Sequence, residues 1–219
     1  MPAGFTDLMF SGIYDDETDS CHYIELLNPT SSAIDLSNYT LGFDNNFTYP
    51  SAAPVSGFTG TVSLSGTIAA ESTFMVQVTT ISGGCASCPT ISPNQTIVAG
   101  IGLNVDDRLV LVENYGTGSA TAIDVWQNHS TELVDPLFNK GYVFARDFGA
   151  TAPSSTFSLA DWNYDGNEDC FGFAIASTPL PTVNTHPSDN SSCSTINFSV
   201  SATAGNGGAL TYQWMYNDG

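Results

Sequence analysis

The sequence has almost no basic residues. Only three Lys and Arg residues, Arg108, Lys140 and Arg146, oppose 22 Asp and Glu residues, and the formal net charge is -19 at pH 7. Phosphate backbones and anionic membranes both attract clustered Lys and Arg. The composition therefore argues against direct nucleic-acid binding and against binding to an anionic membrane surface. Such an acidic protein suits a salty exterior, divalent cations or a basic partner, although ordinary solubility chemistry also explains the charge.

Long apolar runs are also missing. No stretch approaches the roughly 20 apolar residues that a membrane helix needs, and the first four residues lack the charged and apolar parts of a signal peptide. Membrane insertion is therefore not expected. Abundant Ser, Thr, Asn and Gly, with cysteines in Gly- and Ser-rich contexts, nevertheless indicate an extracellular or cell-surface protein. On this interpretation the signal was removed before residue 1, or the chain is part of a longer one.

No segment keeps a helical period, so we predict an all-β fold. Short runs of β-branched and aromatic residues alternate with Gly, Pro, Asn and Ser clusters, which is typical of an immunoglobulin-like β-sandwich. The predicted strands are Phe5–Ile13, His22–Leu27, Tyr39–Phe43, Gly60–Leu64, Thr73–Val78, Arg108–Glu113, Ala120–Trp126, Gly141–Arg146 and Cys170–Ala174. Two irregular stretches, 45–57 and 82–102, are predicted surface loops, where a binding scaffold places its contacts.

The length of 219 residues allows one complete domain and part of a second. We predict a sandwich over 1–176, a Pro-rich linker over 177–187, and the N-terminal fragment of another immunoglobulin-like domain over 188–219. That fragment contains alternating segments at 195–202 and 209–216. Since such a domain needs about seven strands, the second sandwich is incomplete.

The runs Ile24-Glu-Leu-Leu-Asn-Pro-Thr30 and Ala33-Ile-Asp-Leu-Ser-Asn-Tyr-Thr-Leu41 resemble the opening of a lamin-tail domain. Later segments follow in the order of that family: 106–112, its hairpin partner 122–126, 143–146, and Asp161-Trp162. The resemblance covers about residues 5–175, and the first block is its most specific part. It implies a scaffold or binding module of the kind found in bacterial secreted proteins. The two long loops and the missing coiled-coil rod argue against a nuclear role.

Within the first block, each residue has a structural explanation. Ile24 and Leu26 are expected in the core with Glu25 pointing outward, because side chains alternate along a strand. Pro29 stops the strand by removing a backbone donor, and Asp35 and Ser37 can bond nearby backbone groups. We therefore assign no catalytic residue here. The C-terminal Tyr212-Gln-Trp214 is similar to the strand that carries the core tryptophan of bacterial immunoglobulin-like domains.

A calcium site is one interpretation of the segment 161–169. Oxygen-bearing side chains recur at alternate positions with Gly166 at the turn, which is the spacing of a calcium-binding loop. The predicted ligands are Asp161, Asn163, Asp165, Asn167 and Asp169. A Gly172 stands where such a loop has its bidentate Glu, so an acidic turn between strands is the simpler alternative. No other cofactor is indicated.

The five cysteines leave one without an internal partner. Cys85 and Cys88 form a Cys-x-x-Cys motif, for which a loop disulfide is favoured over a redox pair or half a zinc site. Cys21 with Cys170 is a possible second bridge. Cys193 is then the odd residue, its partner belonging to the missing strands.

These features favour a non-catalytic structural or adhesive module of a larger secreted or cell-surface protein. Its ligand would be a protein or glycan surface, and exposed aromatics near Phe47, Tyr49 and Phe58 are a candidate sugar-stacking platform unless they lie in the core. One alternative is a self-assembling filament or sheath subunit that uses strand addition. A second alternative is an accessory domain of a secreted hydrolase or nuclease whose catalytic part is outside this chain.

Overall fold

The computed structural model describes residues 7–15, 21–45, 52–79, 92–99, 103, 106–129, 142–147, 153–165, 182–185 and 201–203. The chain divides into two compact units, Pro2–Ser177 and Thr178–Gly219, the second also including Met1. Across the described residues of both units, no helix is long and apolar enough to cross a membrane.

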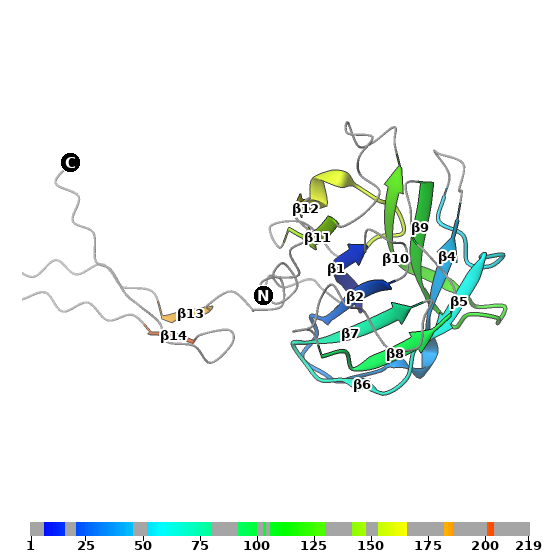
Figure 1. Cartoon of the computed structure of the whole chain (residues 1–219). Helices are drawn as coiled ribbons and strands as arrows, with labels where there is room; N and C mark the ends of the chain where they lie inside the picture. The colour runs from blue at the N-terminus through cyan, green and yellow to red at the C-terminus, as the bar shows by residue number, and fades with distance from the viewer. Residues whose placement is uncertain are drawn as a thin grey trace, which may run out of the picture. The chain divides into compact units, whose positions relative to one another are not determined.

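The first unit contains two main β-sheets (Figure 1). The six-stranded sheet has the order β12 (Trp162–Asp165), β11 (Tyr142–Arg146), β1 (Met9–Asp15), β2 (Cys21–Asn28), β7 (Ser72–Thr79) and β8 (Gln95–Val98). The four-stranded sheet has the order β10 (Thr121–His129), β9 (Asp106–Glu113), β4 (Tyr39–Asp44) and β5 (Gly60–Ser63). A short pair, β3 (Ile34–Asp35) with β6 (Thr67–Ile68), and the 3-10 turns η1 (Leu36–Asn38) and η2 (Leu159–Asp161) complete it.

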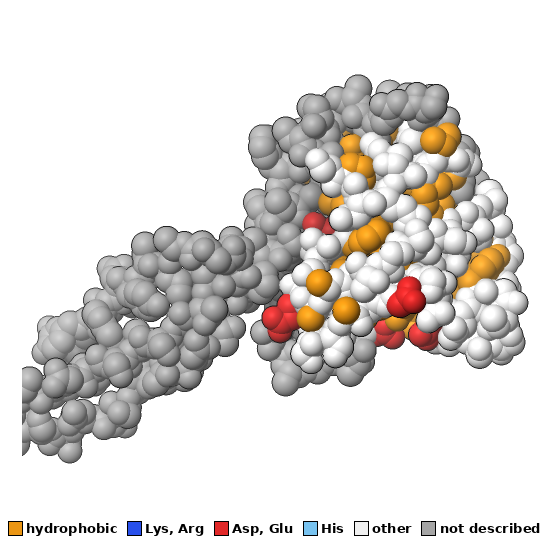
Figure 2. Space-filling view, turned by 90° about the horizontal axis from the view of Figure 1, so that it is seen from below, with side chains coloured by type: hydrophobic (Ala, Val, Ile, Leu, Met, Phe, Trp, Pro, Cys, Tyr) orange, Lys and Arg blue, Asp and Glu red, His pale blue; other side chains and the backbone are white. Residues whose placement is uncertain are grey.

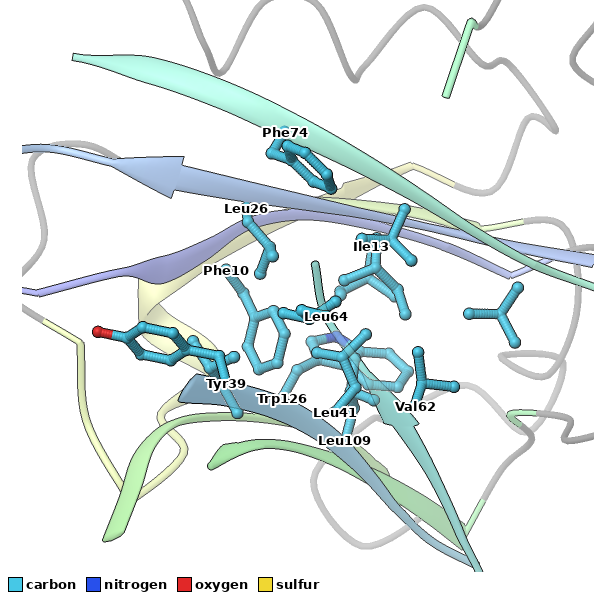
Figure 3. Close-up of a cluster of buried hydrophobic side chains, with 14 of the residues drawn as sticks. Phe10, Ile13, Leu26, Tyr39, Leu41, Val62, Leu64, Phe74, Leu109 and Trp126 are labelled. Carbon is cyan, nitrogen blue, oxygen red and sulfur yellow. The ribbon is translucent and has the colours of Figure 1, made fainter. Parts of the chain in front are cut away.

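The main core lies between the two sheets, as Figure 3 shows. Phe10 and Leu26 from the six-stranded sheet meet Leu41, Leu109 and Trp126 from the four-stranded sheet, and all five are 0% exposed. Burial of large apolar side chains from facing sheets is what stabilises a sandwich. The predicted all-β sandwich is therefore confirmed.

The first eight predicted strands overlap β1, β2, β4, β5, β7, β9, β10 and β11. The ninth, Cys170–Ala174, lies outside the described residues. The prediction that 82–102 is only a loop was wrong, because β8 forms inside it and runs parallel to β7. Its Ile97 packs against the main core, which supplies the stabilisation that so short a run lacks on its own.

A second, smaller cluster covers the outer face of the four-stranded sheet. Val110, Val112 and Val125 pack there against Phe58 and Tyr115, whose rings lie 5.9 Å apart. Phe58 is therefore half-buried in a packed cluster, while Phe47 and Tyr49 lie outside the described residues, and the sugar-stacking platform stays a prediction. The described C-terminal part of the predicted 45–57 loop, residues 52–57, thus lies next to this cluster.

In the second unit, β13 (Thr182–Thr185) pairs antiparallel with β14 (Ser201–Thr203). β13 falls within the range for which the sequence predicts a linker, and its Thr-Val-Asn-Thr sequence has the β-branched residues that favour strands. The segment 209–216 and Cys193 lie outside the described residues. The incomplete second sandwich therefore stays a prediction.

Candidate functional site

Buried ionic groups connect the two sheets at one side of the sandwich. Arg146 on β11 donates from Nη2 to both carboxylate oxygens of Asp124 on β10, at 2.8 and 2.7 Å. The same carboxylate accepts hydrogen bonds from the backbone N–H groups of Phe10, at 2.8 Å, and Ser154, at 3.0 Å. The guanidinium also lies 4.9 Å from the ring centre of Trp162. A buried charge is tolerated when its lone pairs are satisfied in this way.

The environment of Asp124 contains opposing influences on its pKa. Burial raises the pKa, because it disfavours the charged form, whereas Arg146 and the two backbone donors lower it. Asp124 and Arg146 are 0% and 4% exposed, so this ion pair does not face solvent. Its position between β10, β11 and β1 gives it a structural role in joining the sheets.

The other described arginine, Arg108, also makes its contacts inside the protein. Arg108 on β9 donates from Nε to Asp44 on β4 at 3.1 Å and from Nη1 to the backbone oxygen of Ala52 at 3.1 Å. Its side chain is 4% exposed. Both described arginines are thus buried, while Asp35, Glu71 and Asp147 are exposed. On the face shown in Figure 2, the described surface carries acidic side chains and no Lys or Arg.

The outer face of the six-stranded sheet holds a different buried acid, Glu25. The register between β1 and β2 shifts between Phe10 and Gly12, which leaves Ser11 as the extra residue of a β-bulge. The hydroxyl of Ser11 lies 2.7 Å from Oε1 of Glu25 and 3.3 Å from its backbone oxygen. Both residues are buried, with 0% and 3% exposure. Bulges often occur where a sheet must redirect a side chain toward a particular partner.

Burial raises the pKa of Glu25 to about 7, and the hydrogen bond from Ser11 opposes part of that rise. A carboxyl group with such a pKa changes its protonation state near neutral pH. Strand alternation predicts that Glu25 points away from the core, and its side chain does lie on the outer face. It is nevertheless buried there, which strand alternation alone does not reveal.

Beside Glu25, a row of polar side chains crosses three strands. Thr96 on β8 donates to Oε1 of Gln77 on β7 at 3.1 Å, and Nε2 of Gln77 donates to the hydroxyl of Tyr23 on β2 at 3.0 Å. Burial raises the pKa of Tyr23, and the bond from Gln77 opposes the rise. Thr96 is exposed, so the row connects a buried phenol to the surface at an edge strand.

The predicted calcium ligands are only partly described. Asp161 lies at the end of η2, and Asn163 is an exposed residue of β12. The side chain of Asp165, together with Asn167 and Asp169, lies outside the described residues. No group of three or more His, Cys, Asp or Glu side chains suited to a metal ion occurs within the described ranges. The calcium site stays a prediction, which unfolding with and without a chelator tests.

Cys21 is the only cysteine within the described part of the chain, so no disulfide joins two described residues. Cys21 itself is 2% exposed and disulfide-bonded. Cys85, Cys88 and Cys170 lie outside the described residues. The predicted pairings, Cys85 with Cys88 and Cys21 with Cys170, therefore stay predictions.

Neither Asp124 nor Glu25 is a predicted site residue, although both are buried acids. A charged residue within the apolar run Ala122-Ile-Asp-Val-Trp126 was the available signal for Asp124, since a lone acid between core positions requires a partner. For the Ser11–Glu25 pair there was no comparable signal, because it depends on the bulge. No protein-family model, no curated protein and no solved structure matches the chain.

Proposed function

We propose that the chain is a non-catalytic structural or adhesive module of a larger secreted or cell-surface protein, built on a lamin-tail-like sandwich of the immunoglobulin type. The observation that supports it best is the distribution of charge. Both described arginines are buried in ion pairs, Arg146 with Asp124 and Arg108 with Asp44. Acidic side chains remain exposed at the surface. A negatively charged surface attracts positively charged partners and repels negatively charged ones.

The ligand proposed on this basis is a protein surface that carries Lys and Arg. Complementary charge mainly raises association rates and specificity, and salt screens it. The exposed pair Asp35 and Glu71 offers a test, because neither side chain makes an ion pair with a described basic residue. The variant D35N/E71Q removes two negative charges and keeps side-chain shape. N38Q/T121S, at exposed neutral positions, is the matched control.

The experiment measures binding of the labelled chain to arrays of extracellular proteins and of glycans, at low and high salt, together with hydrolysis of generic substrates. We expect salt-sensitive binding to basic proteins, about threefold weaker for D35N/E71Q, since each exposed charge contributes roughly 0.2–1 kcal/mol. The control variant should bind like the unaltered chain. Two results would contradict the proposal: binding that is the same at low and high salt and for D35N/E71Q as for the unaltered chain, or turnover of any substrate.

Self-association by strand addition is a second candidate, and β8 favours it. β8 is the edge of the six-stranded sheet among the described strands, and Val98 on it is 59% exposed. Exposed edge strands pair with other chains unless charge or proline prevents it. Sedimentation should then show concentration-dependent dimers that V98K abolishes. V55K is the control, because Val55 is also exposed, at 37%, but lies in a loop. A strictly monomeric chain rules this candidate out.

A further inference from the structure

Glu25 lies in the interior of the six-stranded sheet, on the face turned away from the main core. β2 has β1 on one side and β7 on the other, and Glu25 is opposite Gly12 of β1 and Met75 of β7. Its neighbours on the same face of β2, Tyr23 and Leu27, are 1% and 4% exposed. The carboxyl group therefore sits among apolar and aromatic side chains, where the charged form is costly.

No described cation compensates this position. Arg146 is committed to Asp124 and Arg108 to Asp44. Besides Glu25, the described titratable side chains on the outer face of β1 and β2 are Tyr14 and Tyr23, while Cys21 is disulfide-bonded and does not titrate. Met75 and Gln77, which β7 contributes to this face, do not titrate either. The hydroxyl of Ser11 is the one hydrogen-bond partner of the carboxyl within the described residues.

Asp124 provides an internal comparison. Its carboxylate accepts four hydrogen bonds, two from Arg146 and two from backbone N–H groups, and a carboxylate has about four acceptor positions. The carboxyl of Glu25 has a single hydroxyl at 2.7 Å. The two buried acids thus differ in how a negative charge would be compensated: Asp124 has a buried guanidinium and four hydrogen bonds, whereas Glu25 has one hydroxyl.

Ser11 fits both protonation states of Glu25, because a hydroxyl both donates and accepts. With the carboxyl protonated, Oε1–H donates to Oγ of Ser11, and the Ser11 hydroxyl donates to the Glu25 backbone oxygen 3.3 Å away. After loss of the proton, the hydroxyl of Ser11 rotates and donates to Oε1. The bulge of β1 places Oγ within reach of both acceptors.

We propose that Ser11 and Glu25 form a proton-dependent latch: the buried outer face accepts the neutral carboxyl beside the β1 bulge, whereas the charge that forms on deprotonation has only the Ser11 hydroxyl to compensate its burial, so the sheet loosens at this point. The folded-state pKa of Glu25, raised by burial to about 7, lies above the ordinary value of 4.5. A raised carboxyl pKa stabilises the fold fully below the unfolded pKa, and this contribution is lost as pH rises through the folded pKa. The latch therefore closes in acid and opens above neutral pH.

The test compares melting temperatures at several pH values between 4.5 and 8.5 for the unaltered chain and for Glu25→Gln. From this group alone, the folding equilibrium constant of the unaltered chain should fall by up to about tenfold per pH unit between the unfolded pKa of 4.5 and the folded pKa of about 7, and level off above that. Glu25→Gln keeps the shape of the neutral acid, so its melting temperature should depend less on pH and exceed that of the unaltered chain at pH 8.5. Glu71→Gln, at an exposed acid, controls for general charge repulsion.

The protonation of Glu25 can also be measured directly in the unaltered chain, which does not depend on whether Glu25→Gln folds. The carboxyl carbon of Glu25 should titrate near neutral pH by NMR in the unaltered chain. The protection of β1 and β2 amides against hydrogen exchange, taken relative to the intrinsic rate at each pH, should fall above that pH. Ser11→Ala should shift the titration to higher pH, since the Ser11 bond favours the charged form. A Glu25 titration below pH 5, or equal pH slopes for Glu25→Gln and the unaltered chain, would overturn the latch.

Discussion

The side-chain amide of Asn28, at the end of β2, ties together the turn that follows it. Its Nδ2 donates to the backbone oxygens of Ser32, at 2.8 Å, and Ala69, at 2.9 Å, with that of Ile68 at 3.3 Å. Its Oδ1 accepts from the backbone and the hydroxyl of Thr30, at 2.9 and 2.8 Å. Asn28 is 0% exposed and Ile68 is 1% exposed, whereas Ser32 and Ala69 are exposed, so loss of the amide removes five hydrogen bonds but orphans mainly the Ile68 oxygen.

Asn28→Ala should therefore lower the free energy of unfolding by about 3 kcal/mol, since it removes several hydrogen bonds that each contribute roughly 0.5–1.5 kcal/mol. Asn28→Asp keeps the acceptor and loses the donors, so it should also destabilise the fold. Asn38→Ala, at an exposed asparagine, should change the free energy by less than about 0.5 kcal/mol. Urea denaturation measures all three variants. Equal stability of Asn28→Ala and Asn38→Ala would show that water replaces the amide.

Residue-level predictions succeeded where the sequence itself determines the geometry. Ile24 and Leu26 are buried in the core, β2 ends at Asn28 just before Pro29, and the carboxylate of Asp35 accepts from the Ser37 backbone at 3.0 Å. These features depend on alternation or on atoms two residues apart. Burial of Glu25 depends on what packs over the sheet, which a single strand's sequence does not contain.

At the scale of elements, the ring of Phe58 packs directly against Gly42 of β4 and so holds its loop against that strand. A Cβ atom at Gly42 would lie 2.4 Å from Cζ of Phe58, which is closer than carbon atoms approach. Gly42 is thus the place where the loop over the four-stranded sheet meets its outer face.

Gly42→Ala should cost about 1–3 kcal/mol, the usual range for overpacking a filled site. The second substitution Phe58→Leu in the same chain should recover part of that loss, because the smaller side chain leaves room for the methyl group. Gly118→Ala is the matched control, since a Cβ there meets nothing within 4 Å. Thermal unfolding measures each variant. An additive effect of Gly42→Ala and Phe58→Leu would contradict the contact.

Strand prediction worked for segments with long β-branched or apolar runs and also for the four-residue β5, but it missed the equally short β8 and β12. β9 and β10 pair as the predicted hairpin, from Asp106 with His129 to Glu113 with Thr121. β8 has four residues between Asn94 and Ala99, and β12 has four within an acidic segment. Such short strands form because a neighbour, β7 or β11, supplies the hydrogen bonds.

At the scale of the whole first unit, several chain segments leave the sheet at the end where Cys21 lies. Cys21 pairs with Thr79, the last residue of β7, while Asp15 pairs with both His22 and Tyr142. Asp165, the last residue of β12, pairs with Val143, which is the neighbour of Tyr142 on β11. The chain thus continues toward Cys85 and toward Cys170 from the same end of the sheet, and the topology permits either as the partner of Cys21.

We expect Cys21 to be joined to Cys170, as the sequence suggests, and Cys85 to Cys88. Peptic digestion without reductant, followed by mass spectrometry, identifies the linked peptides. Cys170→Ser should release Cys21 and lower the free energy of unfolding by about 2–4 kcal/mol, as for loss of a typical disulfide. The double variant C85S/C88S should leave the Cys21 bridge intact. A bridge from Cys21 to Cys85 or Cys88 would contradict the pairing.

The burial of the two described arginines has a consequence for proteolysis. Trypsin cleaves only after Lys and Arg, so this chain offers it three sites, after Arg108, Lys140 and Arg146. Two of these lie inside strands β9 and β11 of the sandwich, with side chains 4% exposed. Native chain should therefore suffer one cut at most, after Lys140, while the unfolded chain yields four fragments. Resistance to trypsin thus becomes a gel-based assay of whether the sandwich is closed.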